Sequence, residues 1–157
     1  MRDSKQLRGA IAAALCAVRR GDERQALRMF DRLAGSSWPT LCGTVIELAD
    51  ANFEMLLAMS GTSRNEDLVV TLTDENGGSV DELEPAQRTA TRVLLALAAD
   101  HRDDAETQLS IAAEADDPEA VGHVLAHTVS WTLDLVSTCE ETGKPVPNWL
   151  RPVLSSS

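Results

Sequence analysis

The chain contains no tyrosine, two phenylalanines and three tryptophans among its 157 residues. β-Strands draw on aromatic and β-branched side chains, whereas alanine and leucine, which are abundant here, favour helices. The shortage of aromatic residues therefore argues against a sheet and predicts an all-α fold. Apolar residues make up 43 % and charged residues 25 %, which is typical of a globular protein rather than a disordered one. A chain of this length predicts a single domain, 1–157.

Long hydrophobic runs are also lacking. Apolar stretches such as 93–99 and 121–125 are far shorter than the ~20 residues of a membrane span. The apolar stretch near the start closes at Arg19 and Arg20 with no cleavage signal, so we interpret it as a helix of the mature protein. The three cysteines form no C-x-x-C pair, and their odd number argues against a disulfide framework. These observations predict a cytoplasmic protein with no membrane partner.

Motifs for the common catalytic chemistries are missing as well. The sequence has no phosphate-binding glycine-rich loop, nucleophile elbow or Rossmann fingerprint, and Gly77-Gly78 stands alone in a predicted turn. No cysteine has a histidine or basic neighbour in sequence that would activate its thiol. Catalysis is therefore without support, and we expect no cofactor.

Negative charge dominates, because 14 Lys and Arg face 25 Asp and Glu for a net charge of −11. This balance argues against an extended surface for nucleic acid or anionic membranes. The positive charge is concentrated: residues 1–35 carry a net +4, which leaves −15 for the remainder. Within that segment Arg20, Arg24, Arg28 and Arg32 recur every four residues, so they are predicted to line one side of a helix as a basic ridge.

The rest of the pattern is helical. Apolar residues recur at three- and four-residue spacing in six segments, with Gly, Asp or Pro at the boundaries. We predict two three-helix units, 4–61 and 85–143, followed by a C-terminal tail at 144–157. The connector at 62–84 is predicted to be either a short β-hairpin or a loop. The second helix, about 23–34, is expected to bury one apolar face: Ala26, Leu27, Phe30 and Leu33.

The two units carry similar patterns at an offset of 79 residues. The matching positions hold turn and packing residues: Ala26 and Ala105, Pro39 and Pro118, Gly43 and Gly122. The surface charge is reversed, since residues 8–35 carry +3 and residues 87–114 carry −2. We interpret the pattern as an internal duplication in which the two surfaces have diverged.

Residues 21–39 also resemble a known helical repeat. Gly21-Asp22 precedes Ala26, an aromatic residue follows at Phe30, and Pro39 closes the segment. This arrangement resembles the second helix of a tetratricopeptide repeat. The resemblance implies a closely packed helical hairpin. The units here are 79 residues apart rather than the 34 of that family, so its peptide-binding groove is not implied.

Two histidines, His123 and His127, lie four residues apart on the predicted sixth helix, which is the spacing of helical zinc ligands. His101 and the acids near it are candidates for a third ligand. Helical metalloproteases carry a glutamate base directly after the first histidine, where this chain has Val124, so proteolysis is not indicated. The alternative interpretation is two partly buried, hydrogen-bonded imidazoles.

Three functional hypotheses follow from these features. The leading one is a non-enzymatic interaction or regulatory protein that binds a protein partner, or a second copy of itself in a homo-oligomer, through the basic ridge and the acidic second half. The second is a nucleic-acid regulator, either a direct DNA binder through the arginines or an acidic DNA mimic. The third is a metal-dependent enzyme that uses His123 and His127.

Overall fold

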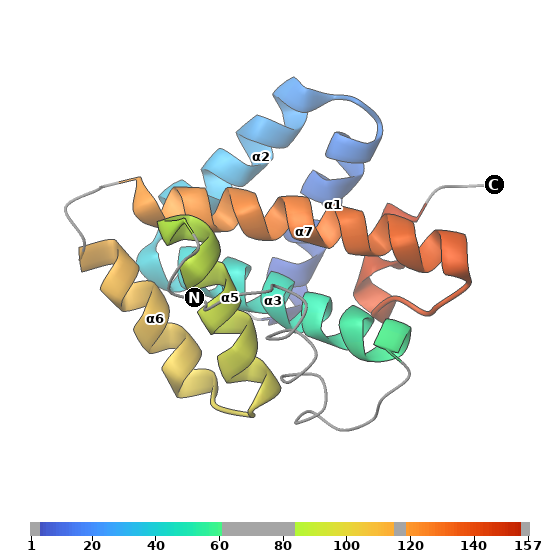
Figure 1. The fold of residues 1–157 in the computed structure, drawn as a ribbon. Helices are drawn as coiled ribbons and strands as arrows, with labels where there is room; N and C mark the ends of the chain where they lie inside the picture. Colours follow the sequence, from blue (N-terminus) through green and yellow to red (C-terminus); the bar gives the residue numbers. More distant parts are fainter. Residues whose placement is uncertain (1–3, 61–83, 115–118, 155–157) are drawn as a thin grey trace.

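The computed structural model describes residues 4–60, 84–114 and 119–154, and all regular structure in these ranges is helical (Figure 1). The predicted all-α class is thus confirmed. The helices in chain order are α1 (Ser4–Arg19), α2 (Glu23–Ser36), α3 (Trp38–Ser60), α5 (Pro85–Ala98), α6 (Arg102–Glu114), α7 (Ala120–Thr142) and the 3-10 helix η2 (Asn148–Val153). The predicted connector lies outside the described residues except for Glu84, so the hairpin and the loop both stay predictions.

Local sequence signals account for the helix boundaries. Gly21 takes a φ of 80° after α1, in the left-handed region where glycine is favoured. The carboxylate of Asp22 then accepts a hydrogen bond from the backbone N–H of Gln25 at 3.2 Å and caps α2. At the end of α7, Gly143 takes a φ of 69° and its N–H bonds back to the last turn. The predicted starts and stops at these positions are confirmed.

The two longest helices, α3 and α7, form the centre of the molecule and make its most extensive helix–helix contact. α1 and α2 pack as one helical hairpin, and α5 and α6 pack as another (Figure 1). Ala26 and Ala105 are buried in these hairpins, where a small side chain allows neighbouring helices to approach closely. Within the described ranges, no helix combines the length and apolar character needed to cross a bilayer.

One hydrophobic core joins the two predicted units. Every helix from α1 to η2 contributes buried apolar side chains to it. Several large side chains are almost completely enclosed: Ile11, Leu15, Ile46, Leu48, Met55, Leu109 and Leu150. Because the apolar faces of both units are buried in the same core, the described residues form a single domain.

A polar contact inside this core ties α3 to α7. The hydroxyl of Thr132 donates a hydrogen bond to Asn52 Oδ1 at 2.7 Å, and both side chains are buried. Asn52 Nδ2 has no hydrogen-bond partner among the described residues. Without the bond from Thr132, Asn52 Oδ1 would also be buried without a partner, which is unfavourable. The bond therefore favours the register of α3 against α7 that brings these two side chains together.

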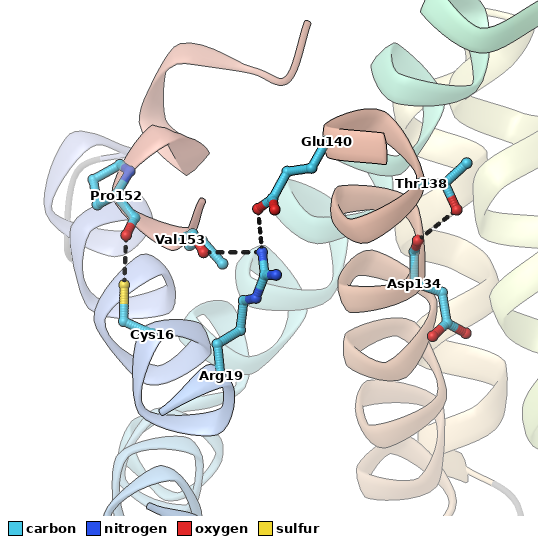
Figure 2. A network of polar contacts seen from close by, with 7 residues as sticks. All are labelled: Cys16, Arg19, Asp134, Thr138, Glu140, Pro152 and Val153. Atoms are coloured by element: carbon cyan, nitrogen blue, oxygen red, sulfur yellow. Dashed lines mark hydrogen bonds and ion pairs between the residues drawn. The ribbon is translucent and has the colours of Figure 1, made fainter. Parts of the chain in front are cut away.

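The C-terminal residues return to α1 (Figure 2). The guanidinium of Arg19, at the end of α1, pairs with the carboxylate of Glu140 on α7 and donates to the carbonyl oxygen of Val153 at 3.1 Å. The thiol of Cys16 donates to the carbonyl oxygen of Pro152 at 3.2 Å. One arginine therefore connects the first helix, the last long helix and η2.

The helix positions agree with the predicted offset between the units. α5, α6 and α7 begin 81, 79 and 82 residues after α1, α2 and α3. The packing is less symmetrical, because α1 contacts η2 extensively whereas α5 lies against both α3 and α7. Similar helix positions do not establish similar packing, so the duplication stays a prediction.

Candidate protein-interaction surface

The four arginines of the predicted basic ridge are exposed, but three of them share a helix. Arg24, Arg28 and Arg32 lie one turn apart along α2, whereas Arg20 lies in the turn before it. The turn falls there because Gly21 has a positive φ and interrupts the helix. Within the described part of the chain, none of the four forms an ion pair. We call these four residues the arginine ridge.

An apolar groove of about 510 Å³ lies beside the ridge, between α2 and α7. Leu27 stands on its α2 side with 64 % of its surface exposed, one turn from Arg24. The other apolar lining residues are Val18, Ala26, Phe30, Ala34, Gly122, Leu125, Ala126, Val129 and Leu133. The polar lining residues are Glu23, Asp31 and Ser130. We call this feature the α2/α7 groove.

The exposure of Leu27 corrects the prediction that this residue is buried. Ala26 and Leu33 are buried, and Phe30 is half-buried. Leu27 is about 100° further around the helix than Ala26, which places it beyond the reach of the neighbouring helices. The apolar stripe of α2 is therefore wider than the surface that the rest of the fold covers.

The α7 edge of the groove carries short side chains. Gly122, Ala126 and Ser130 recur every four residues along it, and all three are exposed. A Cβ atom added at Gly122 would meet no atom within 4 Å, so the space above the helix is open. Short side chains on an exposed helix edge allow another helix to approach the backbone closely.

A second polar cluster, which the sequence pattern did not indicate, joins α1, α3 and α6. Glu47 on α3 is 4 % exposed, and its carboxylate accepts a hydrogen bond from Arg8 Nε at 2.7 Å. Arg102 on α6 lies 3.9 Å from both Glu47 and Asp50. Burial raises the pKa of Asp50 above its ordinary value, and the nearby Arg102 guanidinium opposes that rise. The carboxylates are thus shared between two guanidinium groups.

This cluster has the character of a structural ion-pair network. Cavities of about 600 and 430 Å³ flank it, and Cys42 lines the smaller one. Burial raises the pKa of the Cys42 thiol, Glu106 adds to the rise and Arg102 opposes it. A raised pKa keeps the thiol protonated, whereas a nucleophilic cysteine needs a lowered one. The arrangement therefore does not supply an activated nucleophile.

The two predicted metal ligands have separate surroundings. His123 is exposed and its Nε2 lies 3.7 Å from the carboxylate of Glu119, one turn earlier. His127 is half-buried, and its ring meets Trp131 edge-on with 6.3 Å between the centroids. Across residues 4–60, 84–114 and 119–154, no three His, Cys, Asp or Glu side chains are grouped to hold a metal ion. The metal site stays a prediction, and the described residues offer it no third ligand.

Comparison of the chain with known protein families, curated proteins and solved structures found no significant match. The functional interpretation therefore depends on the surfaces themselves.

Sequence periodicity located the arginines, because four-residue spacing on a helix is a local property. The groove had no such signal, because its walls come from α2 and α7, which lie far apart in the chain. The sequence indicated the groove only through Leu27, which makes the apolar stripe of α2 wider than its buried face.

Proposed function

We propose that this protein is a non-enzymatic protein–protein interaction module that binds through the arginine ridge and the α2/α7 groove. The observation that carries the proposal is Leu27, 64 % exposed at the edge of an apolar groove and next to exposed arginines. Interface cores are enriched in apolar side chains and arginine and depleted in other charged residues. The surface shares the apolar side chains and arginines of an interface centre, and Glu23 and Asp31 are the acids that also line the groove.

Each part of the surface has a distinct role in this proposal. Burial of apolar groove side chains supplies affinity, at about 1.5–3 kcal/mol for a fully buried leucine. The arginines orient an acidic partner and speed its association, which is what exposed charges mainly contribute. The net charge of −11 argues against an extended phosphate backbone as the partner. A cytoplasmic location, predicted because the first apolar stretch reads as a helix of the mature protein, is part of the same proposal.

A site-specific photo-crosslink tests this function. We expect a photoreactive amino acid at position 27, introduced in the organism of origin, to form a covalent adduct with a protein upon irradiation. The matched control is position 13, because Ala13 is exposed on α1 and does not line the groove. The mass of the adduct separates a second copy of the chain from any other protein.

Charge reversal on α2 sharpens the same experiment. Combining Arg24→Glu with Arg28→Glu should reduce the adduct by about tenfold, because the ridge then repels an acidic partner. Circular dichroism of the purified variant checks that the helices are retained. Equal adduct yields at positions 27 and 13, or a yield that is unchanged by the reversal, would contradict the proposal.

A further inference from the structure

A cavity between α3 and α6 combines apolar and charged side chains. Its volume is about 430 Å³, which lies within the range of about 300–1,000 Å³ that is usual for small-molecule sites. Apolar side chains from α1 and α3 line one part of it, among them Leu7, Trp38 and Ile46. The part that α6 supplies is polar and includes Arg102 and Glu106. We call this feature the α3/α6 cavity.

The apolar part of the cavity presents an aromatic surface to solvent. Trp38 is 40 % exposed, whereas Leu7 and Ile46 are buried. A Cβ atom added at Gly43 would lie 3.0 Å from Leu7 Cδ2, so the glycine lets Leu7 pack closely against α3. Covering the exposed part of Trp38 with an apolar group would be favourable.

The polar part presents two opposite charges one helical turn apart. Arg102 and Glu106 have the spacing at which charged side chains on a helix commonly pair, yet they form no ion pair with each other. Arg102 lies 3.9 Å from the carboxylates of Glu47 and Asp50, which is beyond hydrogen-bond distance. Glu106 is exposed and forms no ion pair with a described residue. Both groups therefore retain hydrogen-bonding capacity.

The neighbouring carboxylates are already engaged. Glu47 also lines the cavity, but its carboxylate accepts a hydrogen bond from Arg8 Nε at 2.7 Å. Asp50 lines the larger cavity on the other side of the cluster. A ligand with a single charge would be attracted by one of Arg102 and Glu106 and repelled by the other. A ligand that carries both charges matches both groups.

We propose that the α3/α6 cavity binds a zwitterionic α-amino acid with a large apolar side chain. The carboxylate of the ligand pairs with the guanidinium of Arg102, whose planar set of donors suits a carboxylate. The ammonium group donates to the carboxylate of Glu106, and the apolar side chain covers Trp38. This inference goes beyond the interaction function proposed above, because the cavity and the α2/α7 groove share no lining residue.

Isothermal titration calorimetry of the full chain tests the inference. The probes are L-phenylalanine and two analogues of the same size, phenethylamine without the carboxylate and 3-phenylpropionate without the ammonium group. We expect saturable binding of L-phenylalanine. Each analogue should bind about tenfold more weakly, because it lacks one of the two charged hydrogen bonds.

Two variants assign the charges of the ligand to residues. Arg102→Gln should weaken binding of L-phenylalanine by about tenfold and leave that of phenethylamine unchanged, because phenethylamine has no carboxylate to lose a partner. Glu106→Gln should likewise weaken binding of L-phenylalanine without weakening that of 3-phenylpropionate. The matched control is Glu114→Gln, which removes one negative charge at an exposed position of α6 outside the cavity. Circular dichroism checks that each variant keeps its helices.

Several results would overturn the inference. One is the absence of saturable binding of L-phenylalanine, L-leucine and L-methionine at millimolar concentration. Others are analogues that bind as tightly as L-phenylalanine, and a Glu106→Gln variant that binds it as well as Glu114→Gln does. None of these results affects the crosslink at position 27, so the inference and the interaction function can fail separately.

Discussion

Glu47 and Asp50 lie one turn apart on α3, yet their surroundings differ. Glu47 is 4 % exposed and receives a hydrogen bond from Arg8, whereas the side chain of Asp50 is 42 % exposed and has Arg102 at 3.9 Å. Burial raises the pKa of Asp50, and Arg102 offsets this rise only in part. Ionised Asp50 therefore slightly destabilises the folded state relative to the unfolded state.

We predict that Asp50→Asn makes the protein more stable at neutral pH. Because the pKa of Asp50 is raised on folding, the folded state binds the proton more tightly than the unfolded state. The contribution of Asp50 to wild-type stability therefore falls as the pH rises from the ordinary aspartate pKa of about 3.9 through the folded value. The asparagine variant avoids that loss, so its advantage should disappear in acid. Urea unfolding between acid and neutral pH measures the difference.

Asp134→Asn is the matched control for this prediction. Asp134 is exposed on α7, so the change removes the same formal charge without a buried environment. An advantage of Asp50→Asn that is equal at acid and neutral pH, or equal to that of Asp134→Asn, would contradict burial as the cause.

At the scale of helices, the described ends follow local signals closely. Gly21, Asp22 and Gly143 mark boundaries in the sequence because their backbone preferences and capping bonds involve residues within a few positions. The attachment of η2 to α1 had no comparable signal. It depends on Arg19, which joins Glu140 and Val153, residues more than a hundred positions away (Figure 2).

We predict that Arg19→Ala loosens η2 selectively. The change removes a charge-assisted pair and a hydrogen bond to the Val153 carbonyl, so the free energy of unfolding should fall by about 1–2 kcal/mol. Hydrogen exchange should show faster exchange for the amides of 148–154 than for those of α3. Arg20→Ala is the control, because Arg20 is exposed and forms no ion pair with a described residue. Unchanged exchange in 148–154 would contradict the role of Arg19.

At the scale of the whole molecule, the two predicted three-helix units share one core. Leu15 of α1 and Met55 of α3 belong to the same cluster as Val136 of α7 and Leu150 of η2. α3 and α7 form the most extensive helix contact, and the buried bond between Asn52 and Thr132 crosses it. The first unit therefore obtains much of its burial from the second.

We predict that a fragment of residues 1–60 does not fold alone. Without α7 and η2, the buried faces of α1 and α3 are exposed to water, and three helices of this length retain little structure without tertiary packing. Circular dichroism should show low helix content and no cooperative thermal transition, in contrast to the full chain. A cooperative transition in the fragment would mean that the first unit is an independent domain.

The sequence by itself determined the helical class, most described helix boundaries and the spacing of Arg24, Arg28 and Arg32 along α2, whereas Arg20 lies in the turn before that helix. Each of these depends on composition or on residues within a few positions of one another, such as the four-residue spacing of the arginines. Tertiary structure decided the rest. The pairing of Arg8 with Glu47, the exposure of Leu27 and the α2/α7 groove depend on how distant helices are rotated and packed. No local pattern encodes those rotations, because they result from filling one shared core.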